Sequence, residues 1–138
     1  MNQQVVATKV PDDRRLAFLP EAFTPRTMMR AEGLVYHQAC LLSKQYTGGY
    51  WEFFTLSNGG FYLRPTGRER FDVAIGGNGY EGSVSADAFG VIVTLFVYGA
   101  LVWIDDEALR EKFSNHYHQL RAFAIDHAER EAILSAID

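Results

Sequence analysis

The sequence predicts an α+β fold in a single domain over residues 1–138, with a small antiparallel β-sheet, a meander of about four strands, packed with about four α-helices. Three observations predict this class. An Asn-Gly pair between aromatic runs is typical of a β-hairpin. A long apolar run late in the chain favours a buried helix, and apolar residues at spacings of three and four favour amphipathic helices around it.

The first residues carry few signals of regular structure. Residues 1–13 are expected to form a loosely ordered N-terminal segment, in which Val5 and Val6 are candidates to open an edge strand. The polar stretch Pro11–Arg15 is typical of a solvated turn.

The first helix is expected to start at Thr24-Pro25 and to run to about Lys44. At the start of a helix, the threonine hydroxyl can accept a hydrogen bond from a first-turn amide that has no partner within the helix. Proline suits the next position, because an N–H there would have no helical partner and proline has none. Apolar residues at helical spacing then form the inward face of this helix: Met28, Ala31, Val35, Ala39, Leu42 and Tyr46.

The stretch from Tyr46 to Pro65 predicts a β-hairpin. A type I′ turn at Asn58-Gly59 needs a positive φ at both residues and pairs Leu56 with Phe61. Alternation then gathers the core side chains on one face: Phe54, Leu56, Phe61 and Leu63. The other face is amphipathic enough to take a covering helix or to meet a partner, and it also carries Thr55. Its candidate partner-binding residues are Trp51, Phe53, Tyr62 and Arg64.

Two further strands and three helices complete the prediction. Strands over residues 71–75 and 80–84 flank a glycine-rich turn. Ser85 then caps a helix whose apolar run, residues 88–104, is expected to be buried, since it is short for a membrane span and lacks basic flanks. The acids from residue 105 open the next helix, to about residue 123. A capping box at Asp126 and Glu129 predicts a last helix over residues 127–136.

Composition and charge exclude several functional classes. The net charge of −4 and the pI near 5.5 give no basic stripe for binding nucleic acid, so no direct specific nucleic-acid partner is expected. The single cysteine, Cys40, cannot form an intrachain disulfide and is interpreted as a small core residue. The first ten residues lack the apolar core of a signal peptide, which favours a cytoplasmic protein without a membrane partner.

No cofactor or metal site is expected from the motifs. Residues 77–82 match G-x-G-x-x-G, but helices follow instead of the parallel strand that a dinucleotide fold needs, so these glycines are interpreted as turn residues. His116 and His118 point to opposite sides of a helix and cannot chelate one ion. His116 is expected in the core, whereas His37 and His127 are expected on the surface.

The residues define no catalytic set, so a binding or inhibitory protein is the first hypothesis. The alternative is a small ligand-binding domain or enzyme that uses the concave sheet face with Glu52 or Glu81 as its acid. Glu52 lies near the open end of the hairpin, within reach of a backbone amide, Arg64 or Arg68, so that a structural role is the first interpretation of this carboxylate.

Several motifs resemble the ArdB/KlcA family of plasmid-encoded antirestriction proteins. They are Thr47-Gly-Gly-Tyr-Trp-Glu-Phe, Leu56-Ser-Asn-Gly-Gly-Phe-Tyr with Pro65, Tyr80-Glu-Gly and Ser85-Ala-Asp-Ala. The resemblance extends from about Leu19 to Asp138. Phe53-Phe54 and Gly90-Val91 depart slightly from the expected Phe-Tyr and Gly-Ile, with apolar volume kept.

This resemblance implies a non-enzymatic α+β protein that protects incoming unmodified DNA by inhibiting a host type I restriction-modification system. Its implied partner is the restriction complex or an associated host protein. The modest charge argues against DNA mimicry, since a duplex carries one negative charge per about 1.7 Å of its axis. The oligomeric state follows neither from the residues nor from the resemblance.

Overall fold

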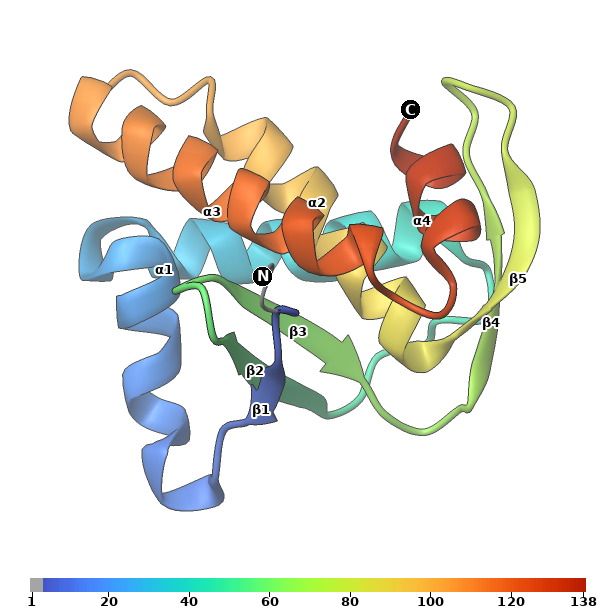
Figure 1. The fold of residues 1–138 in the computed structure, drawn as a ribbon, viewed down its shortest axis with the longest axis horizontal. Coiled ribbons are helices and arrows are strands. Elements are labelled where there is room, and N and C mark those ends of the chain that lie inside the picture. The colour runs from blue at the N-terminus through green and yellow to red at the C-terminus, as the bar shows by residue number, and fades with distance from the viewer. Residues whose placement is uncertain (1–3) are drawn as a thin grey trace.

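The computed structural model describes residues 4–138 and shows an α+β fold, as predicted (Figure 1). The described elements are β1 (Ala7–Lys9), the 3₁₀ turn η1 (Asp12–Arg14), α1 (Arg15–Leu42), β2 (Trp51–Leu56), β3 (Phe61–Pro65), β4 (Arg70–Ala74), β5 (Glu81–Ser85), α2 (Ala86–Leu101), α3 (Glu107–Ile125) and α4 (Arg130–Ile137). Helix α2 lies between the other helices and the strands, and its residues are buried on almost every side. The predicted buried helix is therefore confirmed, but it ends at Leu101, three residues before the end of the predicted run, and Trp103 beyond it is exposed.

The N-terminal segment contains regular structure where a loosely ordered stretch was expected. Strand β1 pairs antiparallel with β2, Ala7 lying opposite Leu56 and Lys9 opposite Phe54. The expected edge strand therefore exists, but it begins at Ala7, just after Val6. Residues 1–3 lie outside the described residues.

The strands form two sheets, so the prediction of one continuous meander is wrong. One sheet has the order β1-β2-β3 and the other is the β4–β5 hairpin. The physical reason lies at the edge of β3, where α2 takes the place of a fourth strand. A Cβ on Gly90 would stand only 2.8 Å from Arg64 Cα, so only glycine permits this close approach.

Thr94 completes the cover of this edge. It is the plainly polar residue of the apolar run, and it is fully buried. Its Oγ1 accepts from the Leu63 amide at 3.2 Å and donates to the Gly90 carbonyl at 2.8 Å. Helix α2 thus bonds an edge amide that would otherwise be buried without a partner.

The hairpin turn has a different geometry from the predicted one. Only Gly59 has a positive φ, 92°, and Leu56 exchanges hydrogen bonds across a three-residue loop with the amide of Gly59 and the carbonyl of Gly60. Asn58 instead uses its side chain, which donates to the Gln119 carbonyl at 2.9 Å and accepts from the Gly60 amide.

The three-residue loop shifts the register by one, so the predicted pairing of Leu56 with Phe61 is wrong. Phe53 lies opposite Leu63, and Phe54 lies opposite Tyr62. A shift of one position reverses which side chains share a face. Phe54 and Leu63 therefore lie on opposite faces, and both faces of the hairpin are covered.

Helix α1 consists of two segments joined at Thr24. The segment from Pro25 to Leu42 confirms the predicted helix, and Ala31, Val35 and Ala39 on its stripe are fully buried. The segment before Thr24 was not predicted. Thr24 itself has φ 66° and ψ 152°, which bends the chain sharply between the segments.

The remaining helices follow their predicted capping residues with one exception. Ser85 Oγ accepts from the Ala88 amide, and Asp106 accepts from the Leu109 amide, at 3.1 Å each. The predicted capping box at Asp126 and Glu129 is wrong, because Glu129 bonds Ser85 and α4 begins only at residue 130. None of the helices within residues 4–138 combines the length and apolarity that crossing a membrane requires.

Two single-residue predictions have different outcomes. His116 is buried against Phe61 and Tyr98, as expected. Cys40 is exposed on the outer face of α1, so its interpretation as a core residue is wrong. The helical spacing that places Ala39 inside turns its neighbour outward.

Candidate functional site

The four candidate partner-binding residues do not form one exposed surface. Trp51, Phe53 and Tyr62 have only 3%, 8% and 1% of their surface exposed. The corrected register also separates them, since Trp51 and Phe53 share one face and Tyr62 and Arg64 share the other. Of the four, Arg64 alone keeps substantial solvent access, with 30% of its side chain exposed.

The first face is covered by α1 and the loop that follows it. Phe18 stacks on Phe53 with ring centroids 4.4 Å apart. Trp51 Nε1 donates to Tyr46 Oη at 2.9 Å, so its only polar group is bonded inside the core. These two aromatic residues therefore join the hairpin to α1.

The second face carries a polar cluster centred on Asp87. We name the side chains joined to it by hydrogen bonds and ion pairs the Asp87 cluster: Lys9, Glu52, Tyr62, Arg64, Asp87 and His127. Asp87 Oδ1 accepts from Tyr62 Oη at 2.7 Å and from Arg64 Nη1 at 3.1 Å. Asp87 lies in the first turn of α2, where the helix dipole also favours a negative charge.

Glu52 and Arg64 extend the cluster toward the edge strand. Arg64 donates to Glu52 Oε1 from Nη2 at 2.8 Å and from Nε at 3.2 Å. Lys9 Nζ lies 2.6 Å from Glu52 Oε2. The charges alternate along β1, β2, β3 and α2, so the cluster binds the sheet to the start of the helix. Of the partners that the sequence left open for Glu52, the structure shows Arg64.

His127 closes the other side of the cluster, and its expected surface position is wrong. Only 10% of its side chain is exposed, and its Nε2 lies 2.8 Å from Asp87 Oδ2. Its Nδ1 accepts from the Glu129 amide at 2.9 Å. Because a backbone amide can only donate, Nδ1 carries no proton and Nε2 carries one. His127 therefore donates to Asp87 from Nε2.

The electrostatics of the cluster favour ionised carboxylates. Burial alone raises the pKa of Asp87, but the bonds from His127 and Tyr62 and the charge of Arg64 together lower it below its ordinary value. Hydrogen bonds from Lys9 and Arg64 lower the pKa of Glu52. Burial, with the bond to Asp87, raises the pKa of the Tyr62 hydroxyl, so that it stays a donor.

This arrangement gives the enzyme hypothesis no support. A general acid near neutral pH needs a raised carboxyl pKa, whereas the pKa of Glu52 is lowered. Glu81 is exposed on the β4–β5 hairpin, in the other sheet. Ser85 donates to Glu129 and caps α2, and His127 faces Asp87, so no base is aimed at this hydroxyl. Within residues 4–138, no group of His, Cys, Asp and Glu side chains has the arrangement of a metal site.

Sequence reasoning found part of this cluster. The sequence left Arg64 as one of several partners within reach of Glu52, and the observed register places the two residues directly opposite each other. His127 lies forty positions from Asp87, and its expected place on a helix surface gave no signal of the contact. Asp87 bonds both β3 and the loop before α4, contacts that no local signal in the sequence indicated.

Across residues 4–138, the fold and the Asp87 cluster define a class of protein without a recognisable catalytic constellation. Comparisons with known proteins name the family. The "Antirestriction protein" family matches residues 44–138. "Antirestriction protein KlcA" of Escherichia coli is 46% identical, covering 99% of this chain and 97% of that protein. "Putative antirestriction protein YubI" of E. coli strain K12 is 35% identical, with 96% of each chain covered.

A solved structure agrees with these relatives. It superimposes with a TM-score of 0.90 at 44% sequence identity, covering 100% of this chain and 98% of the other. The solved structure is described as one of the KlcA and ArdB proteins, which show a novel fold and antirestriction activity against type I DNA restriction systems in vivo but not in vitro. The chain belongs to the antirestriction protein family.

Proposed function

We propose that this protein protects incoming unmodified DNA by inhibiting a host type I restriction-modification system. One observation carries the proposal: the chain aligns over its whole length, at 44% identity, with a structure from work describing type I antirestriction activity of the KlcA and ArdB proteins in vivo. The protein acts without catalysis and without a cofactor, in the cytoplasm, where the restriction enzyme meets incoming DNA.

The charge distribution supports a mechanism other than DNA mimicry. A mimic about 40 Å long needs on the order of twenty net negative charges along one ridge. This chain has 17 acidic and 13 basic residues, a net charge of −4. Glu52 and Asp87 form ion pairs with Lys9 and Arg64 within the fold, so these two carboxylates contribute little negative electrostatic potential at the protein surface.

The partner in this proposal is a protein: the restriction complex itself or a host factor associated with it. The activity of the relatives in vivo but not in vitro supports a role for a component that purified enzyme lacks. Direct, sequence-specific contact with nucleic acid is no part of the mechanism, because the chain has no excess of basic charge.

Plating of unmodified phage tests the proposal. Cells with a type I restriction system are infected with and without this protein, beside cells that lack the system. We expect the protein to raise the plating efficiency on restricting cells and to leave it unchanged on the others. Equal plating efficiency on restricting cells with and without the protein contradicts the proposal.

A further inference from the structure

The outer edge of β4 carries main-chain groups without a strand partner. The Ile75 amide donates to the Tyr80 carbonyl at 2.9 Å, which places Ile75 at a hydrogen-bonded position of the ladder with β5. The alternation of an antiparallel ladder therefore turns the N–H and C=O groups of Arg70, Asp72 and Ala74 away from β5. Within residues 4–138, neither main-chain group of Ala74 meets a hydrogen-bond partner.

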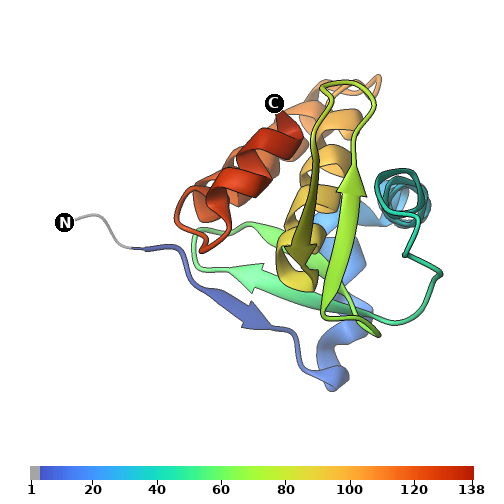
Figure 2. The same ribbon diagram turned by 90° about the vertical axis from the view of Figure 1, so that its right-hand side faces the viewer.

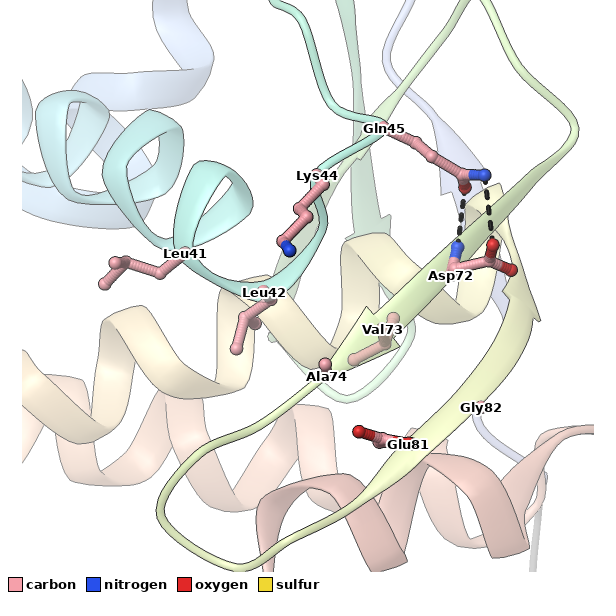
Figure 3. A pocket seen from close by; sticks show the side chains of 9 residues that line it. All are labelled: Leu41, Leu42, Lys44, Gln45, Asp72, Val73, Ala74, Glu81 and Gly82. Carbon is pink, nitrogen blue, oxygen red and sulfur yellow. Dashed lines mark hydrogen bonds between the residues drawn. The ribbon is translucent and has the colours of Figure 1, made fainter.

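A side-chain amide already bonds this edge one position earlier. Gln45 Oε1 accepts from the Asp72 amide at 2.7 Å, and its Nε2 donates to Asp72 Oδ2 at 3.1 Å (Figure 3). A carboxamide has the donor and the acceptor of a peptide unit. At Asp72, the Gln45 carboxamide therefore occupies the place that a peptide group of an added strand would take. No segment of the chain that the structure describes bonds the edge in the same way at Ala74.

An open pocket adjoins the same edge. It has a volume of about 570 Å³, and β4 borders it opposite the C-terminal end of α1 (Figure 2). Leu42 and Val73 point toward its interior from these two elements (Figure 3). Alternation along an added strand directs every second side chain to the face of Val73, where an apolar side chain fits beside Leu42.

The charges at the edge of β4 indicate which side chains an added strand would carry at the alternate positions, which face away from the pocket. Asp72 and Glu81 are exposed on the opposite face of the hairpin, where the alternate positions of an added strand lie. Basic side chains complement them. Pairing of β4 with a second copy of itself about Asp72 would oppose two carboxylates, which disfavours self-association through this edge.

The other sheet edges are less suited to strand addition. Strand β1 is only three residues long and carries Lys9, features that blunt an edge. On β5, the Ser85 amide donates to Glu129 and the Ser83 carbonyl accepts from Arg70. Helix α2 covers the edge of β3.

We propose, on the basis of the function proposed above, that the free edge of β4 binds its protein partner by strand addition. The partner supplies an extended segment in which apolar and basic residues alternate. Its main chain bonds the N–H and C=O groups of Ala74, an apolar side chain enters the pocket beside Leu42, and a basic side chain lies against Asp72.

Ala74→Pro tests the surface in cells. Proline removes the amide that points away from β5 and leaves the β4–β5 ladder intact, and edge positions of this kind accept proline. Ala74→Val is the matched control, because it keeps the amide. We expect Ala74→Pro to reduce phage plating on restricting cells to the level without the protein, while Ala74→Val protects like the wild type. A folded Ala74→Pro protein that protects fully overturns the inference.

A titration of the purified wild-type protein tests the same edge without reference to restriction. The probe is a short peptide of alternating valine and lysine, and its control is the same peptide with alternate amides N-methylated. We expect saturable shifts of the Arg70, Asp72 and Ala74 amide resonances with the first peptide only. Absence of saturable shifts at millimolar peptide overturns the inference. The plating result of the wild type decides the proposed function separately.

Discussion

Thr24 and Asp87 show how single residues determine the local geometry. Thr24 has a backbone conformation, φ 66° and ψ 152°, that is almost confined to glycine. The bend there lets the first segment of α1 bury Phe18 and Phe23 while the second segment buries Val35. Asp87 instead joins three parts of the chain through its two carboxylate oxygens.

We predict that Thr24→Gly raises the free energy of unfolding by about 1 kcal/mol, because glycine adopts this conformation without strain. Thr24→Ala is the control: it also loses the hydroxyl bond to Thr27, but it keeps the Cβ that causes the strain. Urea denaturation measures both. Equal stability of the two variants would falsify the strain argument.

We predict that Asp87→Asn lowers the free energy of unfolding at pH 7 by about 1–3 kcal/mol, because the amide is a weaker acceptor for the three donors that bond this partly buried carboxylate. The pKa of Asp87 is lowered in the fold from an ordinary 3.8, so its carboxylate stabilises the protein above that value and the stabilisation is lost as the pH falls through the lower folded pKa.

The measurement for Asp87 is denaturant unfolding at several pH values. The wild type loses stability below about pH 4, and Asp87→Asn shows a smaller loss there. Asp126→Asn, at an exposed position of the loop before α4, is expected to follow the wild type. Acid profiles of the same slope in Asp87→Asn and the wild type would contradict the role of this carboxylate.

At the scale of elements, the contact of α2 with β3 decides the topology. The helix presents Gly90 and Thr94 one turn apart to the edge of the strand, the first for close approach and the second as an acceptor. A helix with larger side chains there would stand off the strand and leave the Leu63 amide unbonded. Sheet and helix therefore fit only with these two residues in place.

We predict that Gly90→Ala lowers the free energy of unfolding by about 1–3 kcal/mol, because its Cβ meets the main chain of β3 at Leu63 and Arg64. Gly99→Ala is the matched control in the same helix. Its Cβ meets nothing closer than 3.9 Å, at Tyr117, so the better helix propensity of alanine is expected to stabilise it by up to about 1 kcal/mol.

Thermal and urea unfolding of these two variants give the comparison. Both variants add one methyl group to α2, but we expect the free energy of unfolding to fall in Gly90→Ala and to rise in Gly99→Ala. A Gly90→Ala protein as stable as Gly99→Ala would show that the helix can move away from the strand without loss.

At the scale of the whole molecule, α2 joins two sheets that do not pair with each other. The β4–β5 hairpin packs on α2 through the stacked rings of Phe71 and Phe89, 4.5 Å apart. The other sheet meets the same helix through Gly90 and Asp87. In this arrangement β4 lies beside the C-terminal end of α1 (Figure 2), and the pocket lies between them.

We predict that the purified protein does not compete with duplex DNA for a purified type I restriction enzyme. The net charge of −4 is too small for a duplex mimic, and ion pairs inside the fold neutralise part of the acid. A competition binding assay at low and moderate salt checks this. Displacement of DNA, with affinity that collapses as salt rises, would refute the prediction.

The sequence by itself determined the elements whose signals are local. The cap at Ser85 and the apolar run behind it specify α2, and the acids before Leu109 specify the start of α3. The glycine-rich turn between two alternating runs specifies β4–β5. Such signals come from residues a few positions apart, and so they survive without knowledge of the rest of the chain. The family resemblance rested on equally local motifs.

Only the tertiary structure decided the hairpin register, the burial of Trp51 and the partners of Asp87. Asn58 bonds Gln119, sixty-one positions away, and this contact accompanies the three-residue loop in place of the predicted two-residue turn. His127 meets Asp87 because α3 and the loop after it return to the start of α2. Contacts of this kind depend on how whole elements pack, and no spacing along the chain encodes them.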